Sequence, residues 1–360
     1  MTQRHIELSD GRRIGDGHAC FIIAEAGSNW RMGTPERDLA MARALVDVAV
    51  EAKCDAVKFQ TYRANSVYVA NAGESDYLAE MGVRKSITEI FEDLSMPYEL
   101  IPAIAEYCVE QGIRFMSTPF SLEDVAAVDP YTDFHKIASY EISHTELQDH
   151  LASLGKPLVF STGASTLDDI DYAMQRLRTG GAQSIAVMQC TARYPTPFAH
   201  AHVRTVTTLK ERYGVPVGLS DHTRHPTVAP SAAVALGANL IEKHYTLSNR
   251  LPGADHPFAL EPHELKAMVE AIRQTEEVMG SADKGVSEAE EELLAFARRG
   301  VQALRDLHEG DVVRLNENVA ILRPGKRRPG AHPRHLDRLE GATLARSIAA
   351  GDGIHLDDVS

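Results

Sequence analysis

Apolar positions along the chain follow two alternating spacings. Eight short runs are almost continuous in apolar residues, which is typical of parallel strands buried on both faces. These runs cover residues 20–24, 55–59, 113–117, 134–138, 157–161, 184–190, 216–219 and 239–243. Between them apolar residues recur every three to four positions, as from Leu39 to Ala49, and this spacing predicts helices. Eight strand–helix units predict an α/β fold, a closed (β/α)8 TIM barrel, over residues 1–280.

A doubly wound open sheet is the main rival, because it shows the same alternation of strands and helices. That fold usually carries a Gly-x-Gly-x-x-Gly motif after its first strand, and none follows the run that ends at Ala24. Capping signals at Ser121–Asp124 and Thr166–Asp169 indicate where two of the helices begin. The barrel is therefore the predicted fold.

The pattern changes after Gly280. Residues 281–298 are rich in acidic residues with a helical spacing, and we interpret them as a connector. Residues 299–360 hold short strands and many turns, and the stretch from Ala303 to Asp311 is similar to that from Ala345 to Asp352. Two copies of one β-turn-β unit predict a small pseudo-symmetric β domain of about 60 residues, a size that can fold alone.

Charge and composition exclude several classes of protein. The 360 residues carry a net charge of −14, so no global field would attract nucleic acid or an anionic membrane. An anionic substrate would need a local basic site. Residues 1–17 lack the apolar core of a signal peptide, and no apolar run is long enough to cross a bilayer. The four cysteines have no paired spacing, so we expect reduced thiols in a cytoplasmic protein.

Polar residues gather where the expected strands end. In a parallel barrel the functional side chains lie at the carboxyl ends of the strands. One charged residue there is often only a solvated rim residue, but seven of eight ends carry ionisable or metal-binding groups, which favours an active site. The residues are Glu25, Lys58, Gln60, Thr118, Lys136, Ser139, Glu141, Ser161, Thr162, Gln189, Tyr194, Ser220, Asp221, His222, Glu242, Lys243 and His244.

Two histidines form a candidate metal pair. His222 and His244 end strands that are neighbours in a closed barrel, so their imidazoles can converge. Two histidines leave coordination positions for water, a carboxylate or substrate, which suits a catalytic Mn²⁺ or Mg²⁺. The alternative is two hydrogen-bonded structural histidines.

Lys58 and Lys136 are candidates for binding a phosphate or a carboxylate, because lysine acts as a point charge in such sites. One of them could instead form a Schiff base, since barrels also host aldolases of that kind. The alternative is a purely structural role, in which the lysine forms a buried ion pair with Glu25 or Glu141.

Nine short motifs follow one another along the predicted barrel. They lie at residues 23–29 (IAEAGSN), 57–60 (VKFQ), 117–120 (STPF), 136–141 (KIASYE), 161–163 (STG), 189–197 (QCTARYPTP), 218–223 (GLSDHT), 242–244 (EKH) and 252–255 (PGAD). Any one motif alone is weak, but the ordered series is highly specific. It resembles the sialic acid (N-acetylneuraminate) synthase family from about Cys20 to Gly280, and the tail resembles the C-terminal antifreeze-like (SAF) domain of that family.

The resemblance implies roles for individual positions. His222 and His244 match the family's metal ligands, usually for Mn²⁺, with Mg²⁺ or Co²⁺ as other possibilities. Glu25, Lys58, Lys136, Glu141 and Asp221 are the expected catalytic residues, with Glu25 the best candidate for proton transfer. Substrate-binding roles are implied for Gln60, Thr118, Ser139, Ser161, Tyr194, Ser220, Asp255 and Arg323.

Two departures from the family pattern bear on these roles. Ala192 stands where the family often has Asn, so a contact to the donor could be missing or moved. The loop after Arg323 is longer than usual, so Arg327 or Arg328 could replace Arg323 as the arginine that the SAF domain offers to the partner subunit's site in a homodimer.

The expected reaction joins phosphoenolpyruvate to N-acetylmannosamine or a related N-acetylated amino sugar, with C–O cleavage. A di-N-acetylated deoxy sugar leading to legionaminic or pseudaminic acid, and a 6-phosphorylated acceptor, stay open. Rival functions are a Schiff-base pyruvate aldolase, a synthase for a seven- or eight-carbon sugar acid, and a non-enzymatic binding module. The SAF-like tail argues against a synthase for a seven- or eight-carbon sugar acid. The polar residues at the barrel mouth argue against a non-enzymatic binding module.

Overall fold

A computed structural model describes residues 5–75 and 84–360; the first four residues of the amino-terminal segment lie outside the described part. The chain divides into two compact units, Met1–Gly280 and Ser281–Ser360. Each unit is described by itself. Among the described helices, none has both the length and the apolar character needed to cross a membrane.

The first unit is a barrel of eight parallel strands, which confirms the predicted fold. Their order is β5-β4-β3-β10-β9-β8-β7-β6, and β5 lies beside β6 to close the ring. All eight predicted runs are strands, with ends that differ by at most three residues. The bounds are β3 Phe21–Gly27, β4 Ala56–Thr61, β5 Arg114–Pro119, β6 His135–Ile137, β7 Leu158–Ser161, β8 Ile185–Cys190, β9 Val217–Asp221 and β10 Leu240–His244.

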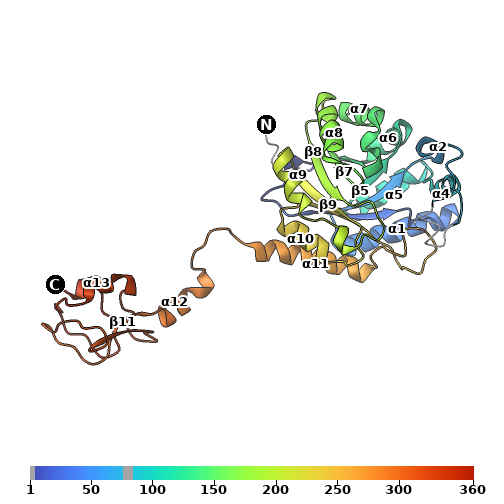
Figure 1. Ribbon diagram of the computed structural model, residues 1–360. Coiled ribbons are helices and arrows are strands. Elements are labelled where there is room, and N and C mark those ends of the chain that lie inside the picture. The colour runs from blue at the N-terminus through green and yellow to red at the C-terminus, as the bar shows by residue number, and fades with distance from the viewer. Residues whose placement is uncertain (1–4, 76–83) are drawn as a thin grey trace. The chain divides into compact units, whose positions relative to one another are not determined.

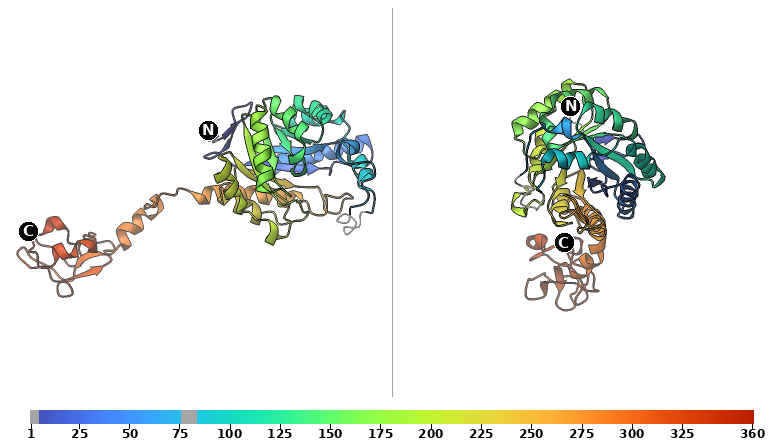
Figure 2. Two further views of the ribbon diagram at one scale, coloured as in Figure 1. Left: turned by 45° about the horizontal axis from the view of Figure 1, so that its top comes forward. Right: turned by 90° about the vertical axis from the view of Figure 1, so that its right-hand side faces the viewer.

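Helices cover the outside of these strands (Figures 1 and 2). Ser121 and Thr166 accept hydrogen bonds from the amides of Asp124 and Asp169, so both predicted capping signals are confirmed. The helices are α1 Pro35–Glu51, α2 Ala64–Val67, α4 Ile87–Leu94, α5 Leu100–Glu110, α6 Leu122–Val128, α7 Thr145–Ser153, α8 Leu167–Thr179, α9 Thr205–Tyr213, α10 Val228–Ala235 and α11 Pro262–Met279.

An amino-terminal hairpin, β1 His5–Glu7 and β2 Arg13–Gly15, was not predicted. Its apolar residues Ile6, Leu8 and Ile14 are buried and belong to the same cluster as side chains of the barrel interior. The hairpin therefore contributes to the apolar core of the barrel, while the carboxyl ends of the strands stay available for chemistry.

The second unit contains helix α12 Glu291–Ala297, strands β11 Gly300–Ala303 and β12 Val319–Leu322, and helix α13 Leu336–Leu339. The predicted internal repeat is confirmed. Leu307 and Ile348, which are equivalent in the two copies, exchange both backbone hydrogen bonds at 2.9 Å. The equivalent glycines Gly310 and Gly351 both have positive φ, 91° and 81°, a conformation that glycine adopts without strain. The two copies are thus related by a local pseudo-twofold axis.

Candidate active site

A pocket of roughly 670 Å³ lies at the carboxyl ends of the barrel strands. Fourteen of the fifteen residues to which the sequence assigned a role belong to this unit, and thirteen of them line the pocket, whereas Asp221 does not; the fifteenth, Arg323, belongs to the second unit. The thirteen are Glu25, Lys58, Gln60, Thr118, Lys136, Ser139, Glu141, Ser161, Tyr194, Ser220, His222, His244 and Asp255. Strand geometry brings eight of them together, because alternate residues of a strand point into the barrel, and the other five lie in the connections that follow the strands.

The floor of the pocket holds a buried ion pair. Lys58 Nζ lies 2.5 Å from Glu25 Oε2 and donates to Thr118 Oγ1 at 2.9 Å. Gln60 Nε2 donates to the other oxygen of Glu25, also at 2.9 Å. The ion pair that the sequence offered as an alternative for Lys58 is therefore present, and it lies inside the pocket. Its ammonium group faces the same space that a substrate would enter.

Lys136 shares a second carboxylate, that of Glu242, with Lys58. Glu242 Oε1 lies 3.6 Å from Lys58 Nζ, and its Oε2 lies 3.8 Å from Lys136 Nζ. Ser220 donates to Glu242 at 3.3 Å, and Lys136 donates to Ser161. The sequence places Glu242 at a strand end and implies no role for it, although its position two residues before His244 puts both side chains on one face of β10.

Two lysines and two carboxylates make the floor nearly neutral. Burial raises the pKa of Glu25 to about 7, although Lys58 favours its charged form. Burial also acts on Lys58, but the carboxylates of Glu242 and Glu25 outweigh it and raise its pKa. Burial lowers the pKa of Lys136, which Glu242 offsets only in part. A strongly anionic ligand would therefore favour protonation of Glu25.

His222 and His244 face one another from adjacent strands, with ring centroids 5.5 Å apart. Nδ1 of His222 donates to the carbonyl of Thr191 at 2.8 Å, so its Nε2 keeps a free lone pair. Nδ1 of His244 is buried without a hydrogen-bond partner. Burial, together with neighbouring positive charge, holds the pKa of His244 well below its usual value. Neutral imidazole is the form that binds a metal, and the lowered pKa of His244 meets that condition. Burial acts in the same direction on His222, but Cys190 outweighs it and raises the pKa of His222, so a divalent cation between the two rings would displace a proton from His222.

The pair is an incomplete metal site on its own. Across residues 5–75 and 84–360, no group of three or more His, Cys, Asp or Glu side chains is arranged to hold an ion. Asp255 lies beside the pair, with Oδ2 3.6 Å from Nδ1 of His244. A Cβ on Gly27, whose φ is +53°, would come within 2.7 Å of that oxygen, so glycine makes room for Asp255. Water or substrate would supply the remaining ligands.

Other predicted residues form the sides of the pocket. The Tyr194 ring is tilted over the His222 ring at 4.0 Å between centroids. Ser139 accepts a hydrogen bond from the Gly163 amide at 3.0 Å. Burial raises the pKa of Glu141 to about 7. Ala192 lies beside Gly163, since a Cβ on that glycine would come within 2.9 Å of the Ala192 Cβ.

Asp221 does not reach the pocket, although the sequence placed it among the catalytic residues. It points to the opposite side of β9 and pairs with Lys243 at 2.5 Å. Side chains alternate along a strand, so Asp221 cannot share the orientation of its neighbours Ser220 and His222. Its carboxylate instead binds Lys243 on the outer side of the barrel.

Three candidate arginines lie in the second unit, in different environments. Arg328 is held by Asp358 with contacts of 3.0 and 3.3 Å, and Arg327 lies 3.9 Å from Asp352. Arg323 is exposed and makes no ion pair within the part of the chain that the structure describes. Arg323 and Arg327 are thus both exposed, and Arg328 is the one that is tied down by a close ion pair.

An aromatic wall above the floor was missed by the sequence reasoning. Tyr62 packs on Phe91 at 4.7 Å, Tyr68 packs on Phe91 at 4.9 Å, and all three line the pocket. They come from the long connection after β4, which has no strand pattern to place them. Such faces suit the C–H surface of a sugar or an acetyl group.

This polar floor, histidine pair and aromatic wall at the mouth of a parallel barrel define an enzyme site. Comparison with known proteins then gives the family. The model described as NeuB family matches residues 45–284, and the SAF domain matches residues 298–360. The chain belongs to the NeuB family of nonulosonic acid synthases and carries a C-terminal SAF domain. Enzymes of this family use phosphoenolpyruvate and an amino sugar, and generally a divalent metal ion.

Several named relatives cover nearly the whole chain. The chain is 38% identical to the spore coat polysaccharide biosynthesis protein SpsE of Bacillus subtilis, over 97% of this chain and 95% of that protein. It is 33% identical to the N,N'-diacetyllegionaminic acid synthase of Legionella pneumophila, over 94% of each. It is 27% identical to the human N-acetylneuraminate-9-phosphate synthase, over 97% and 95%.

Solved structures agree with these matches. The crystal structure of Bacillus subtilis SpsE superposes with a TM-score of 0.66 at 36% identity and covers 99% of both chains. An N-acetylneuraminic acid synthetase from Leptospira borgpetersenii, in complex with citrate, superposes with a TM-score of 0.71 at 27% identity. It covers 81% of this chain and 95% of that one.

Proposed function

We propose that this chain condenses phosphoenolpyruvate with N-acetylmannosamine or a related N-acetylated amino sugar to give a nine-carbon 2-keto acid. C3 of the donor bonds to the aldehyde carbon, water adds its oxygen to C2, and the C2–O bond to phosphate breaks. The observation that supports the proposal most is the joint position of Lys58 and Lys136 on one buried carboxylate, in a pocket that also holds His222 and His244.

The donor site is assigned to the lysine side of the pocket. Lys58 and Lys136 provide positive charge for the phosphate and carboxylate, and Thr118, Ser139 and Ser161 provide hydroxyl groups beside them. These contacts would hold the donor close to the aldehyde and would oppose the charge of a tetrahedral centre at C2.

Glu25 is assigned the proton transfer. Its carboxyl group lies on Lys58, and its pKa of about 7 lets it exist in either protonation state near neutral pH. Because two lysines balance two carboxylates before substrate binds, the arriving donor brings excess negative charge and favours the protonated acid. Glu25 can then deliver that proton to the oxygen of the former aldehyde.

His222 and His244 are assigned to a divalent cation, Mn²⁺ by preference, with Mg²⁺ or Co²⁺ as alternatives. When bound, such an ion would polarise the aldehyde as a Lewis acid. Asp255 lies beside this pair and, with Gln60, Glu141 and Tyr194, is assigned to the sugar side of the pocket.

For the acceptor we propose a class of sugars and not a single compound. N-acetylmannosamine is the first choice, and a di-N-acetylated deoxy sugar is the second because relatives at about 33% identity are named legionaminic and pseudaminic acid synthases. The raised pKa of Lys58 disfavours that residue as the nucleophile of a Schiff-base aldolase, whereas burial lowers the pKa of Lys136 and leaves Lys136 as the lysine that such a rival would use. Borohydride trapping with pyruvate tests that rival, since only an imine-forming lysine would be labelled.

The C-terminal domain is assigned to the active site of a partner subunit in a homodimer. Residues 298–360 carry eleven Lys and Arg residues against nine Asp and Glu residues, although the whole chain has a net charge of −14. A basic domain on an acidic protein favours docking at the acidic barrel of a second copy. Arg323 would then offer its planar donors to the sugar, with residues 281–298 as the connector.

Subunit sharing is tested by complementation. His222→Ala and Arg323→Ala should each be inactive, and a mixture should recover part of the activity, because a mixed dimer holds one intact site. Arg328→Ala is the matched control, since that side chain is tied to Asp358. No recovery after verified subunit exchange would contradict sharing through Arg323.

The bond that breaks is tested in ¹⁸O-water. The proposed route places the water oxygen on carbon, so released phosphate should stay unlabelled. Label in the phosphate would mean P–O cleavage and would overturn the proposed mechanism. The phosphate is the decisive fraction, because the keto oxygen of the product exchanges with water.

A further inference from the structure

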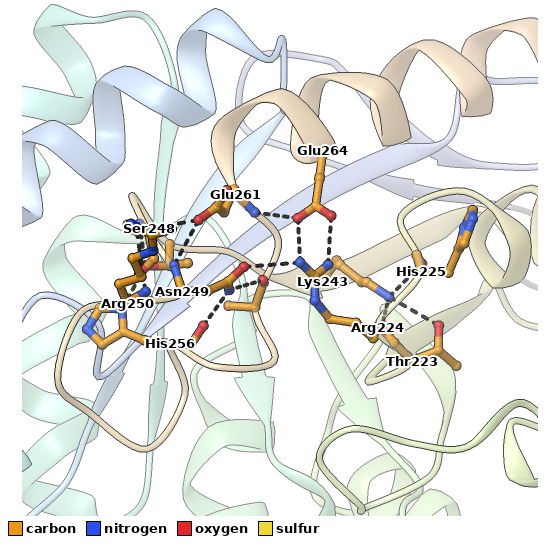
Figure 3. Close-up of polar contacts among 12 residues, drawn as sticks. Thr223, Arg224, His225, Lys243, Ser248, Asn249, Arg250, His256, Glu261 and Glu264 are labelled. Atoms are coloured by element: carbon orange, nitrogen blue, oxygen red, sulfur yellow. Dashed lines mark hydrogen bonds and ion pairs between the residues drawn. The ribbon is translucent and has the colours of Figure 1, made fainter.

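Lys243 is a buried charged residue with no part in the proposed chemistry. Its side chain is 2% exposed and lies outside the pocket lining. The ammonium group lies 2.5 Å from Asp221 Oδ2, donates to the carbonyl of Thr223, and also contacts Thr223 Oγ1 at 3.2 Å and the carbonyl of His225 at 3.3 Å. Figure 3 shows Lys243 reaching Thr223 and His225. Asp221 is equally buried, at 2% exposure.

The ion pair joins the two strands that carry the histidines. Lys243 of β10 and Asp221 of β9 are direct partners in the parallel ladder. His222 directly follows Asp221, and His244 directly follows Lys243. Because side chains alternate along a strand, the two histidines point to the inner face. The Asp221–Lys243 ion pair, called the clamp below, therefore joins the ends of β9 and β10 on their outer face. On the inner face, at the same level, the two histidines face each other.

The clamp also fixes the chain that follows His222. Asp221 accepts from the amide and hydroxyl of Thr223 at 2.8 and 3.0 Å, so its carboxylate is fully engaged. Arg224 contacts both carboxylate oxygens of Glu264 at 2.9 Å and reaches Asn249 at 3.1 Å, as Figure 3 shows. The segment after β9 is thus tied both to β10 and to helix α11.

The same network reaches the loop that carries Asp255. Asn249 donates to the carbonyls of His256 and Ala259 at 2.6 and 2.8 Å. Asp255, just before His256, approaches His244 Nδ1 at 3.6 Å. One continuous set of contacts therefore links the outer clamp to three groups on the inner side: His222, His244 and Asp255.

Stability alone does not account for a charged pair at this place. Removing two charges from water is costly, and replacing a buried pair by apolar residues of similar volume is often neutral or stabilising. What apolar side chains cannot reproduce is the set of directed contacts from Lys243 to Asp221, Thr223 and His225. Directed contacts fix orientation, which is what a pair of convergent imidazoles requires.

We propose that the Asp221–Lys243 pair is a positioning device that sets the orientation of His222 and His244 across the pocket. The inference rests on the proposed function in one respect, namely that the two histidines bind a divalent cation. Neither Asp221 nor Lys243 touches substrate in this scheme. Their effect passes through the backbone of the two strand ends.

The test replaces both charges by apolar side chains of similar size, in Asp221→Leu/Lys243→Met. We expect this full-length double variant to melt within about 3 °C of the wild type, or above it. The Mn²⁺ dissociation constant, measured by electron paramagnetic resonance, should rise tenfold to a hundredfold, as for other residues that orient metal ligands. The kcat should fall with it, while the KM for phosphoenolpyruvate should change less than threefold.

A second readout needs no metal. In protein labelled with ¹⁵N-histidine, the Nδ1 proton that His222 donates to Thr191 should give a signal that is absent from His222→Gln. The double variant should lose this signal. Arg273→Met is the matched control, because it removes an ion pair with Asp55 at the other end of the barrel. It should keep both the signal and the wild-type Mn²⁺ affinity.

Each outcome decides the inference. A folded double variant that keeps the His222 signal and binds Mn²⁺ as the wild type does would overturn it. If the double variant does not fold, Thr223→Val removes only one hydroxyl from the clamp and should weaken Mn²⁺ binding twofold to fivefold; unchanged binding would overturn the inference. If the wild type binds no Mn²⁺, the metal assignment in the proposed function fails, and the His222 signal alone decides the inference.

Discussion

Replacing Glu242 by glutamine keeps the size of the side chain but removes the negative charge that Lys58 and Lys136 share. The carboxylate lies 3.6 and 3.8 Å from the two ammonium groups. At an effective dielectric constant of about 20, each attraction is on the order of 4 kcal/mol before desolvation is counted. Breaking a buried charge cluster by removing one member costs about 3–5 kcal/mol net.

The lower end of that range applies, because Glu25 still neutralises Lys58 in the variant. A loss of about 3 kcal/mol corresponds to a fall in Tm of roughly 5 °C for a domain of this size. The donor should bind more tightly, because the floor changes from neutral to positive. We expect the KM for phosphoenolpyruvate to fall threefold to tenfold, which is about 0.6–1.4 kcal/mol. The kcat should fall at least tenfold as the lysines move from their positions.

The assay combines steady-state phosphate release with calorimetric melting. Glu276→Gln is the control, because that carboxylate pairs with Arg273 at 2.9 Å, away from the pocket. It should leave the KM unchanged. A Glu242→Gln variant with a KM that rises threefold or more and an unchanged Tm would refute the reasoning. That result would place Glu242 on a substrate instead of between the lysines.

Three further predictions concern single groups. Burial raises the pKa of Glu141 to about 7 when the chain is folded, so the folded state binds its proton more tightly and loses stability as pH rises from about 4.5 through 7. Glu141→Gln should therefore exceed the wild type in thermal stability at pH 8, by about 1.5 kcal/mol after a discount for partial exposure, and match it more closely at pH 4.5; the opposite trend would contradict this. Chelation should abolish turnover and Mn²⁺ should restore it, whereas His244→Ala should stay inactive in excess Mn²⁺; full turnover in excess chelator would exclude the metal role. In Gly163→Ala the new Cβ would lie 2.8 Å from Ser139 Oγ, so displacement of that hydroxyl should raise the donor KM about tenfold, and an unchanged KM would remove Ser139 from the donor site.

Most of the barrel and of its mouth could be predicted because both follow from periodicity. Strands buried on both faces have near-continuous apolar runs, and residues at their carboxyl ends share one rim. That logic places His222 and His244 together. Because side chains alternate along a strand, Asp221 must point away from the face that Ser220 and His222 share, and Glu242 must share a face with His244. The sequence therefore contained the information needed to place both Asp221 and Glu242.

Other parts of the site have no periodic signal. Tyr62 and Tyr68 come from the long connection after β4, and Phe91 comes from the short helix α4 within it, so tertiary packing decides how the three rings meet. The amino-terminal hairpin has strands of only three residues, too short for alternation to stand out. The environments of Arg323, Arg327 and Arg328 differ in the acidic residue with which each one pairs. The sequence pattern does not predict such ion pairs, because the partners lie on turns that are distant along the chain.

The mass of the product tests the central claim most directly. The full-length protein would be incubated with Mn²⁺, phosphoenolpyruvate and a panel of acceptors: N-acetylmannosamine, its 6-phosphate, and di-N-acetylated deoxy sugars. The account predicts phosphate release that depends on an N-acetylated acceptor, and a product whose mass equals that acceptor plus pyruvic acid. A protein that releases no phosphate with any acceptor, yet becomes covalently labelled when borohydride reduces its imine with pyruvate, would contradict it.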